Sequence, residues 1–206
     1  MSLNVVGLKT LLDTGRSEEE IKTLLLSFCS LPAKDFNEVH DVQYFLHDKA
    51  IQYEKLDISR TYLVLSQYKE SPILVGYFSL ANKPMVISKR NFSKFSNSLK
   101  KRLMGIGHKT DSENYEVKGY LLGQLGKNFS SEAIASKAIT GRDLMKLANE
   151  AMLVSYEAVG GRIFYLECED ELKLKEFYRR EGFAEIIDFK SPNGLCVFVR
   201  KISQIL

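Results

Sequence analysis

The sequence predicts an α/β (α+β) protein, because helix-like and strand-like segments alternate along most of its 206 residues. Strands are indicated by short runs rich in β-branched and aromatic residues, and helices by apolar residues recurring at i, i+3 and i+4. From residue 39 to residue 202 the order is helix, hairpin, strand, helix, strand, helix, hairpin. Neither an internal repeat nor a low-complexity linker interrupts this order, so a single domain is the simplest account.

The N-terminal part is predicted to contain two helices followed by a hairpin. Ser17 and Glu20 have the spacing of a capping box, and the apolar residues behind them indicate a first helix that ends near Pro32. A longer helix is expected over residues 39–56, because its apolar residues mark one face. The hairpin is expected to consist of strands at 61–66 and 73–80, joined by a turn at 70–72.

The rest of the chain is predicted to alternate strands with helices. Residues 85–87 allow a short strand, and residues 88–104 form a basic helical candidate with an apolar stripe, ended by Gly105 and Gly107. The later segments are a strand over 115–124, a small polar stretch over 130–140, a helix from 141 to about 158, and two C-terminal strands over 185–189 and 195–199.

Residues 161–183 are the most informative stretch of the chain. Residues 162–168 form a mostly apolar run rich in β-formers, too short for a typical helix, which predicts a buried strand. The next segment starts with acidic residues and places Phe177 and Tyr178 on its apolar face, which predicts a helix. Gly182 is placed for a left-handed C-terminal cap. The ordinary explanation of such a tyrosine is core packing with one surface hydroxyl group.

This arrangement resembles the C-terminal signature of the GNAT acyltransferase superfamily, a strand ending in Leu-Glu-Val followed by a helix reading Leu-Tyr-x-x-x-Gly-Phe. The matching residues are Leu166, Glu167, Cys168, Phe177, Tyr178, Gly182 and Phe183. The resemblance covers about 39–202 and implies a mixed, mostly antiparallel central sheet with helices on both faces. By comparison with the family, residues 1–38 are an N-terminal helical extension, 39–206 the acetyltransferase domain, and 88–110 a basic helical insertion within it.

The resemblance also implies a coenzyme A site at the start of the helix at residue 141. The family binds the pyrophosphate on backbone N–H groups there, because unpaired amides and the helix dipole attract anions. Of the family pattern Gln/Arg-x-x-Gly-x-Gly/Ala only the last glycine is kept, since Ser136 and Ile139 replace the first two motif residues. The implied phosphate-binding residues are Thr140, Gly141, Arg142 and Asp143, and an ordinary helix start is the alternative.

A second implied contact with acetyl-coenzyme A lies in the central strand. Residues 122–128, Leu-Gly-Gln-Leu-Gly-Lys-Asn, resemble the segment Leu-x-Arg-Leu-Ala-Val-Asp of many GNAT enzymes, notably of the toxin-type branch. The alignment implies that backbone groups of Leu125, Gly126 and Lys127 contact the pantetheine arm. A glycine such as Gly126 suits a place where a ligand or another chain approaches closely, and a plain bulge is the alternative.

The reaction implied by the resemblance is direct transfer of an acetyl group from acetyl-coenzyme A to an amine. Tyr178 would be the general acid that protonates the leaving thiolate, and amides near Leu125 and Lys127 would stabilise the oxyanion. The general base stays open between Glu167, Glu116 and a chain of water molecules. A structural role for Glu167, paired with a basic residue, is the competing interpretation.

The net charge of +3 is concentrated in one region. Residues 71–110 contain no acidic residue and eight basic ones, which leaves 21 basic against 26 acidic residues in the rest of the chain. Such a region bears on partners more than on fold. With the toxin-like segment it suggests an enzyme acting on aminoacyl-tRNA, with tRNA as a partner. A solvated amphipathic helix is the preferred explanation, because the basic positions fall on several sides of the helix.

The cysteines and the apolar runs indicate where in the cell the protein is expected to be. Cys29, Cys168 and Cys196 are odd in number and widely spaced, so neither a disulfide framework nor a metal site is predicted. Cys168 and Cys196 are expected to be buried thiols in strands. Because no apolar run is long enough to cross a bilayer and no N-terminal signal is recognised, a cytoplasmic location without membrane contact is expected.

The expected function is therefore an acetyl-coenzyme A-dependent N-acetyltransferase without a metal, acting on an amine whose identity the sequence does not give. A non-catalytic GNAT-fold binding module is the second hypothesis, supported by the eroded glycine motif. The amphipathic first helix suggests that the N-terminal extension builds a homodimer. A shared fold specifies neither the acceptor nor the length of the acyl chain.

Overall fold

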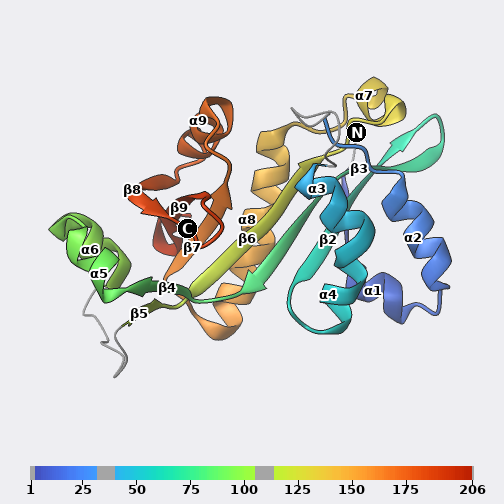
Figure 1. Ribbon diagram of the computed structural model, residues 1–206. Helices are drawn as coiled ribbons and strands as arrows, with labels where there is room; N and C mark the ends of the chain where they lie inside the picture. The colour runs from blue at the N-terminus through green and yellow to red at the C-terminus, as the bar shows by residue number, and fades with distance from the viewer. Residues whose placement is uncertain (1–2, 32–39, 105–113, 206) are drawn as a thin grey trace. The chain divides into compact units, whose positions relative to one another are not determined.

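The computed structural model describes residues 3–31, 40–104 and 114–205 (Figure 1). The chain divides into two compact units, of which the first comprises Met1–Ala81 with Gly123–Ala148 and the second Asn82–Leu122 with Asn149–Leu206. The strand β6 (Gly119–Lys127) and the helix α8 (Gly141–Val159) contribute residues to both units.

The first unit is built of antiparallel strands and short helices. Its strand β2 pairs antiparallel with both β1 and β3. In chain order its elements are β1 (Asn4–Gly7), α1 (Leu8–Asp13), α2 (Glu18–Leu26), α3 (Asp41–Tyr44), a π-helical turn (Phe45–Lys49), α4 (Ala50–Lys55), β2 (Arg60–Tyr68), β3 (Ser71–Asn82), the second half of β6, α7 (Ser131–Ser136) and the first turns of α8.

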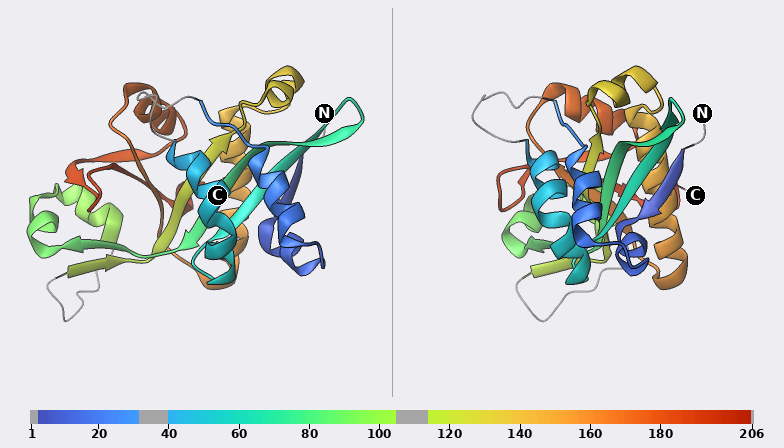
Figure 2. Two further views of the ribbon diagram at one scale, coloured as in Figure 1. Left: turned by 45° about the vertical axis from the view of Figure 1, so that its right-hand side comes forward. Right: turned by 90° about the vertical axis from the view of Figure 1, so that its right-hand side faces the viewer.

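The helices α1, α2 and α4 share one apolar core with β2 and β3. Figure 2 (right) shows α2 and α3–α4 on the same side of these strands. The buried residues of this core are Leu8, Ile21, Leu25, Phe28, Leu46, Ala50, Leu63, Leu74 and Tyr77. The predicted capping box is present at the start of α2, where Ser17 and Glu20 exchange side chain to backbone hydrogen bonds of 3.0 and 3.2 Å.

The hairpin of β2 and β3 turns at Lys69 and Glu70. Both residues have left-handed backbones, with φ of 45° and 66°, as in the two-residue turns whose twist suits a hairpin. The turn predicted at 70–72 therefore starts one residue earlier, and Pro72 lies inside β3 opposite Gln67.

The second unit combines a sheet with a separate two-stranded ladder. In chain order its elements are β4 (Met85–Ser88), α5 (Lys89–Lys94), α6 (Asn97–Met104), β5 (Asn114–Val117), the first half of β6, the rest of α8, β7 (Ile163–Cys168), α9 (Leu172–Arg180), β8 (Ala184–Lys190), β9 (Cys196–Lys201) and a 3-10 turn (Ile202–Gln204). β6 and β7 pair in parallel, β9 pairs antiparallel with β7 and β8, and β4 pairs with β5.

The two faces of β7 look toward different helices. Side chains alternate along a strand, so Phe164, Leu166 and Cys168 share one face, and residues 163, 165 and 167 share the other. The Phe164 ring lies 5.6 Å from the Phe183 ring behind α9. The opposite face joins the core beneath α5 and α6, formed by Met85, Ile87, Phe92, Phe95, Leu103, Val117, Ile163, Tyr165, Ile186, Val197 and Val199.

The strand β8 stands last in the order β1-β2-β3-β6-β7-β9-β8 and is irregular. Its register against β9 shifts between Glu185 and Lys190. Within this interval Asp188 has a left-handed backbone with φ of 61°. The strand is therefore bulged along part of its length.

The predicted fold class is confirmed, because the sheet is mixed, mostly antiparallel and accompanied by helices. Four elements differ from the expected ones. The helix α7 lies within the stretch 130–140, which was expected only to be small and polar. The N-terminal segment contributes the strand β1 as well as helices, the basic helix is broken into α5 and α6 at Phe95, and the strand over 115–124 is divided into β5 and β6. Phe95 has an extended backbone with ψ of 147°, which ends α5.

Some expected features lie outside the described residues. They are the helix end near Pro32, the start of the second helix at residue 39, the glycines at 105 and 107, and the last part of the 88–110 insertion. In the part of the chain that is described, no helix has both the length and the apolar character needed to span a membrane.

Candidate functional site

Tyr178 projects from α9 into an aromatic environment in the second unit. Its ring centroid lies 6.0 Å from that of Phe198 on β9 and 6.2 Å from that of Phe183. Burial raises the pKa of the Tyr178 phenol above its ordinary value, and the neighbouring Cys168 thiol raises it further. Within the described residues the hydroxyl group makes no hydrogen bond. The phenol is protonated at neutral pH, as an ordinary tyrosine is, and this is the form that a general acid requires.

The helix that carries Tyr178 ends in the cap predicted from Gly182. Gly182 has φ of 85°, and its N–H donates to the Arg179 carbonyl at 3.0 Å. The Phe183 N–H donates to the Tyr178 carbonyl at 3.0 Å, which completes a Schellman motif. This cap turns the chain so that Phe183 packs behind the helix.

Ion pairs hold the same helix against β8. Lys175 contacts Glu185 at 2.8 Å and Asp170 at 2.9 Å, and Arg179 contacts Glu185 at 2.6 Å. Hydrogen bonds from Lys175 and Lys190 keep the pKa of Asp170 well below its usual range. The position of Tyr178 is therefore fixed by ion pairs on the outer side of α9 and by aromatic contacts on its inner side.

Glu167 lies on the other face of β7. Strand alternation places it with Tyr165, whose pKa is raised to a high value mainly by burial and secondly by the charge of Glu167. Glu167 is half-buried and forms no ion pair with a described residue. The two proposed catalytic side chains are thus not gathered on one face of the strand. Glu116, the weaker candidate base, is exposed on β5 opposite Val86.

The start of α8 has a well-formed cap in the first unit. The Asp143 carboxylate accepts from the Thr140 N–H at 2.9 Å and from the Thr140 hydroxyl at 2.6 Å. In return, the Asp143 N–H donates to the Thr140 hydroxyl at 3.2 Å. These bonds lower the pKa of Asp143. The amides of Gly141 and Arg142 occupy the first helical positions, where the helix provides no carbonyl partner.

The two departures from the family's glycine pattern have structural roles. Ile139 is buried in the apolar interior. Ser136 is also buried, and its hydroxyl donates to the Ala133 carbonyl and accepts from the Ala138 N–H. Lys137 between them has a left-handed backbone with φ of 49° at the end of α7. These residues shape the turn between α7 and α8.

The glycine of β6 at position 126 is enclosed by side chains of its own unit. A Cβ atom there would lie 2.5 Å from Val42, 2.8 Å from Phe28 and 2.9 Å from Tyr77. Close packing of these three side chains therefore accounts for Gly126 without a ligand, and the bulge considered from the sequence is not needed to explain it. Leu125 and Lys127 on either side are half-buried.

Asn128, directly after β6, is a structural residue that sequence reasoning missed. Its amide oxygen accepts from the N–H groups of Cys29 and Ser130, and its amide nitrogen donates to the carbonyls of Ser27 and Leu74. All four capacities of this buried side chain are used. Asn128 aligns with the aspartate of the family segment Leu-x-Arg-Leu-Ala-Val-Asp, and this match could have indicated its role.

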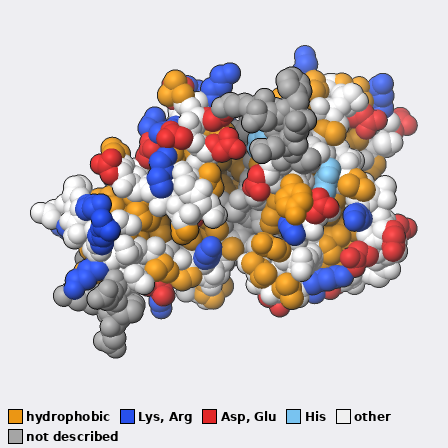
Figure 3. All heavy atoms as spheres, in the orientation of Figure 1, with side chains coloured by type: hydrophobic (Ala, Val, Ile, Leu, Met, Phe, Trp, Pro, Cys, Tyr) orange, Lys and Arg blue, Asp and Glu red, His pale blue; other side chains and the backbone are white. Residues whose placement is uncertain are grey.

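The basic region forms an exposed surface in the second unit. In Figure 3, Lys and Arg side chains gather over α5 and α6 at the left of the view. Lys83, Lys89, Arg90, Lys94 and Lys101 are exposed, while Lys100 and Arg102 are half-buried. None of these seven side chains forms an ion pair with a described residue. The predicted apolar stripe is buried beneath them through Phe92, Phe95 and Leu103.

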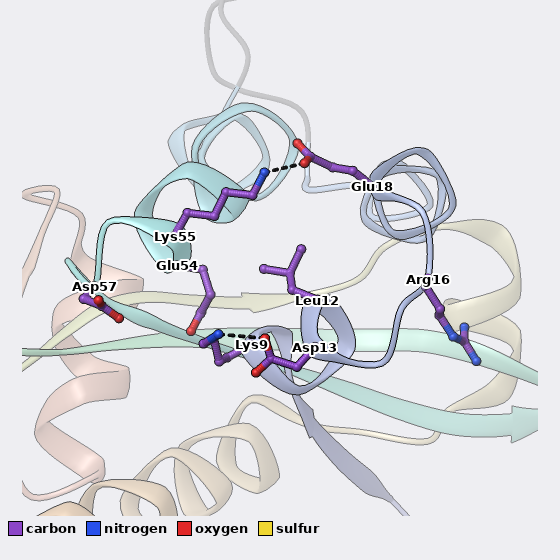
Figure 4. Close-up of a pocket in the computed structure, with 8 residues that line it drawn as sticks. All are labelled: Lys9, Leu12, Asp13, Arg16, Glu18, Glu54, Lys55 and Asp57. Atoms are coloured by element: carbon purple, nitrogen blue, oxygen red, sulfur yellow. Dashed lines mark hydrogen bonds and ion pairs between the residues drawn. The ribbon is translucent and has the colours of Figure 1, made fainter.

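Two pockets lie away from the expected site residues. One, of about 430 Å³, is in the first unit (Figure 4) and is lined by Lys9, Leu12, Asp13, Arg16, Glu18, Glu54, Lys55 and Asp57. Its charges are largely paired, Lys9 with Asp13 and Lys55 with Glu18. The other, of about 410 Å³, lies in the second unit between α5–α6 and β8. Neither contains a residue predicted from the sequence to bind acetyl-coenzyme A or to react, although Lys94 and Arg102 of the basic region line the second pocket.

Across the described residues no cluster of histidine, cysteine and carboxylate side chains is suited to hold a metal ion. His40 caps α3 by accepting from the Val42 N–H at 3.4 Å, and a ring nitrogen of His47 lies 3.0 Å from the Phe28 carbonyl oxygen. His108 lies outside the described residues.

Known proteins of the same fold are found by structure and not by sequence. Neither a protein-family model nor a curated protein matches the chain. A tyrosine-to-phenylalanine mutant of KacT matches with a TM-score of 0.62 and 18% identity, over 100% of this chain and 98% of that chain. AtaT complexed with acetyl-methionyl-tRNAfMet matches with a TM-score of 0.62 and 18% identity, over 99% and 97% of the two chains.

AtaTR bound with acetyl-coenzyme A also matches, with a TM-score of 0.58 and 18% identity over 98% of this chain and 95% of that chain. At this level of identity the likeness is one of fold. The fold is that of GNAT-type acetyltransferases, and the similar structures are toxins of that type.

Proposed function

We propose that this protein is an acetyl-coenzyme A-dependent N-acetyltransferase that transfers the acetyl group directly to an amine. The observation that carries the proposal is Tyr178. It stands on a Schellman-capped helix after β7 and is packed among aromatic rings, and burial raises the pKa of its phenol. A protonated phenol of this kind can donate its proton to the sulfur of the leaving coenzyme A thiolate.

Acetyl-coenzyme A would supply the activated acyl group, and the start of α8 suits its pyrophosphate. The amides of Gly141 and Arg142 and the positive end of a 19-residue helix favour an anion there. The exposed Arg142 adds a positive charge. The Asp143 carboxylate is engaged by Thr140, which leaves these two amides to a ligand. Backbone groups of Leu125, Gly126 and Lys127 are proposed for the pantetheine arm.

Calorimetric titration with acetyl-coenzyme A tests the proposed cofactor site. Micromolar binding is expected for the wild type and is expected to be lost in Gly141→Asp, which adds a negative charge where the phosphates would lie. Gly7→Asp is the matched control, because it adds the same charge at the start of α1, where a Cβ atom meets only the Thr10 hydroxyl at 3.4 Å. A folded wild type that binds no acetyl-coenzyme A would contradict the proposal and favour a non-catalytic binding module.

Aminoacyl-tRNA is the acceptor class that we would test first. The AtaT structure with acetyl-methionyl-tRNAfMet supports it, and so do the basic side chains on α5 and α6, which form no ion pair with a described residue. Binding to tRNA should then weaken steeply with added salt, and Lys94→Glu with Lys101→Glu should weaken it more than Lys9→Glu does. Equal affinity for tRNA in all of these variants would direct the search toward small amines and peptides.

The proposed organisation of the chain has its own test. We propose residues 1–38 as an extension to the acetyltransferase domain over 39–206, with 88–110 as an insertion, and a homodimer built through the extension. Light scattering of the full chain should give twice the mass of one chain. A variant with Leu26→Glu on the exposed side of α2 should lower it if this helix forms the contact, since Leu26 is 51% exposed.

A further inference from the structure

Two of the three cysteines face each other across the sheet of the second unit. Cys168, the last residue of β7, stands directly opposite Cys196, the first residue of β9, in an antiparallel register. Opposed residues of an antiparallel pair place their side chains on the same face, with Cα atoms about 4.5 or 5.5 Å apart. Disulfides span Cα separations of about 4.4–6.8 Å, so two residues opposed in this way lie within the range that a disulfide can bridge.

A lysine on a third strand lies next to the two opposed cysteines. Lys190 on β8 is the register partner of Cys196, and its ammonium group lies 2.8 Å from the Cys196 sulfur. Asp170 holds the same ammonium group at 2.8 Å. A cation in contact with a sulfur stabilises negative charge on it, and the thiolate is the reactive form of cysteine. Burial raises the pKa of the Cys168 thiol to about 12.

Both cysteines are free in this structure, and both are nearly enclosed. Cys168 is 7% exposed and Cys196 is 1% exposed. Large thiol reagents and other proteins are therefore excluded, whereas a molecule as small as hydrogen peroxide requires little opening. Cys29 is exposed and lies in the first unit, so it provides a comparison within the same chain.

We propose that Cys168 and Cys196 form a reversible disulfide when the protein meets a peroxide, and that this bond regulates the activity of Tyr178 on α9. The Cys196 thiolate attacks one peroxide oxygen, the O–O bond breaks, and the departing hydroxide takes a proton to become water. The resulting sulfenic acid is attacked by the Cys168 sulfur. The S–O bond breaks, the S–S bond forms, and a second water leaves with the Cys168 proton. Two thiols are oxidised and one peroxide is reduced to two waters.

The bond would be formed beside Tyr178. The Cys168 thiol is close enough to raise the pKa of the Tyr178 phenol, and Phe198, two residues after Cys196, packs against the Tyr178 ring. Oxidation replaces the thiol by a disulfide fixed to β9 and changes the surroundings of the phenol. Acetyl transfer should fall on oxidation and return on reduction, and this part of the inference rests on the proposed function.

Mass spectrometry of the intact chain tests the disulfide without reference to activity. After hydrogen peroxide and alkylation under denaturing conditions, the wild type and Cys29→Ser should lose two alkylatable thiols and the mass of two hydrogens. A digest should show the peptides of Cys168 and Cys196 linked, and a dithiol reductant should separate them. Cys168→Ala and Cys196→Ala should form no such link. Lys190→Met should form it about tenfold more slowly.

Three outcomes would overturn the inference. They are three free thiols in the folded wild type after peroxide treatment, a link that involves Cys29, or a sulfinic acid on Cys196 without a link. Acetyl-coenzyme A turnover of the oxidised and reduced protein is measured separately. If the disulfide forms in a protein that does not turn over acetyl-coenzyme A, only the proposed function is contradicted. If the disulfide form turns over acetyl-coenzyme A as fast as the reduced form, the regulatory role is refuted.

Discussion

Thr140 and Asp143 close the first turn of α8 by reciprocal hydrogen bonds. The helix start that most resembles a coenzyme A phosphate site therefore already contains a negative charge, the carboxylate of Asp143. The carboxylate is directed to the residue before the helix. Neither of the two amides that follow Thr140 donates to a described residue. The negative charge of Asp143 stabilises the helix by facing the positive end of its dipole.

Asp143→Asn should lower the free energy of unfolding by about 0.5 kcal/mol at neutral pH, because it removes a charge from a helix N-terminus. The pKa of Asp143 is lowered in the folded protein. A carboxyl group of this kind stabilises the fold above its unfolded pKa of about 3.9 and loses the effect as the pH falls. Urea unfolding at several pH values should show the difference from wild type vanishing in acid. Asp48→Asn, at an exposed position, should show little difference at any pH.

Tyr178→Phe should reduce acetyl transfer by about 10²–10⁴-fold, the range typical of general acids, while acetyl-coenzyme A still binds. Stability should change little, because the hydroxyl group makes no hydrogen bond to any described residue. Release of free coenzyme A and calorimetry measure the two quantities, and Tyr156→Phe on α8 serves as the control. Near-normal turnover in Tyr178→Phe would remove the tyrosine from the mechanism.

Gly126→Ala should destabilise the protein by about 1–3 kcal/mol, the usual cost of overpacking. The new methyl group would meet Val42, Phe28 and Tyr77 at distances below 3.0 Å. Gly123→Ala in the same strand is the control, since its methyl group would meet only the Ser79 carbonyl oxygen at 3.8 Å. Thermal or urea unfolding of the two variants compares them. Equal stabilities would show that the three side chains around Gly126 can yield.

Asn128→Ala should lower the free energy of unfolding by about 2 kcal/mol or more, because it leaves one buried and three partly buried backbone groups without their partner. Gln124→Ala, four residues earlier, removes only an exposed hydrogen bond to Asp41 of 2.8 Å. Its effect should stay within about 0.5 kcal/mol. If the two variants unfold at the same denaturant concentration, water replaces the bonds of Asn128.

The sequence predicted those parts of the fold that leave a local pattern. The capping box of α2, the apolar stripe beneath α5 and α6, and the Gly182 cap behind Tyr178 each depend on residues within a few positions of one another. The four-residue strand β1 leaves no such pattern, because it is stabilised by pairing with residues 62–65 of β2. The break at Phe95 arises because its side chain is drawn into the core.

The candidate site was less accessible to sequence reasoning. The strand period alone places Glu167 opposite Cys168, but the side on which Tyr178 packs is set by Phe183 and Phe198, and the latter comes from a distant strand. The facing of Cys168 and Cys196 likewise depends on the register between β7 and β9. Registers of this kind are determined by the whole sheet and not by either segment.

The bulge in β8 has a consequence for how the protein behaves at high concentration. A straight outer strand presents a continuous row of free N–H and C=O groups, onto which a strand from another molecule can add. The register shift between Glu185 and Lys190, with Asp188 turned into a left-handed conformation, interrupts that row. Ile187 is 73% exposed within this interval. An uninterrupted β8 would therefore combine free backbone groups with an exposed apolar side chain, which favours aggregation. The irregular strand keeps the molecule from growing by strand addition at this end.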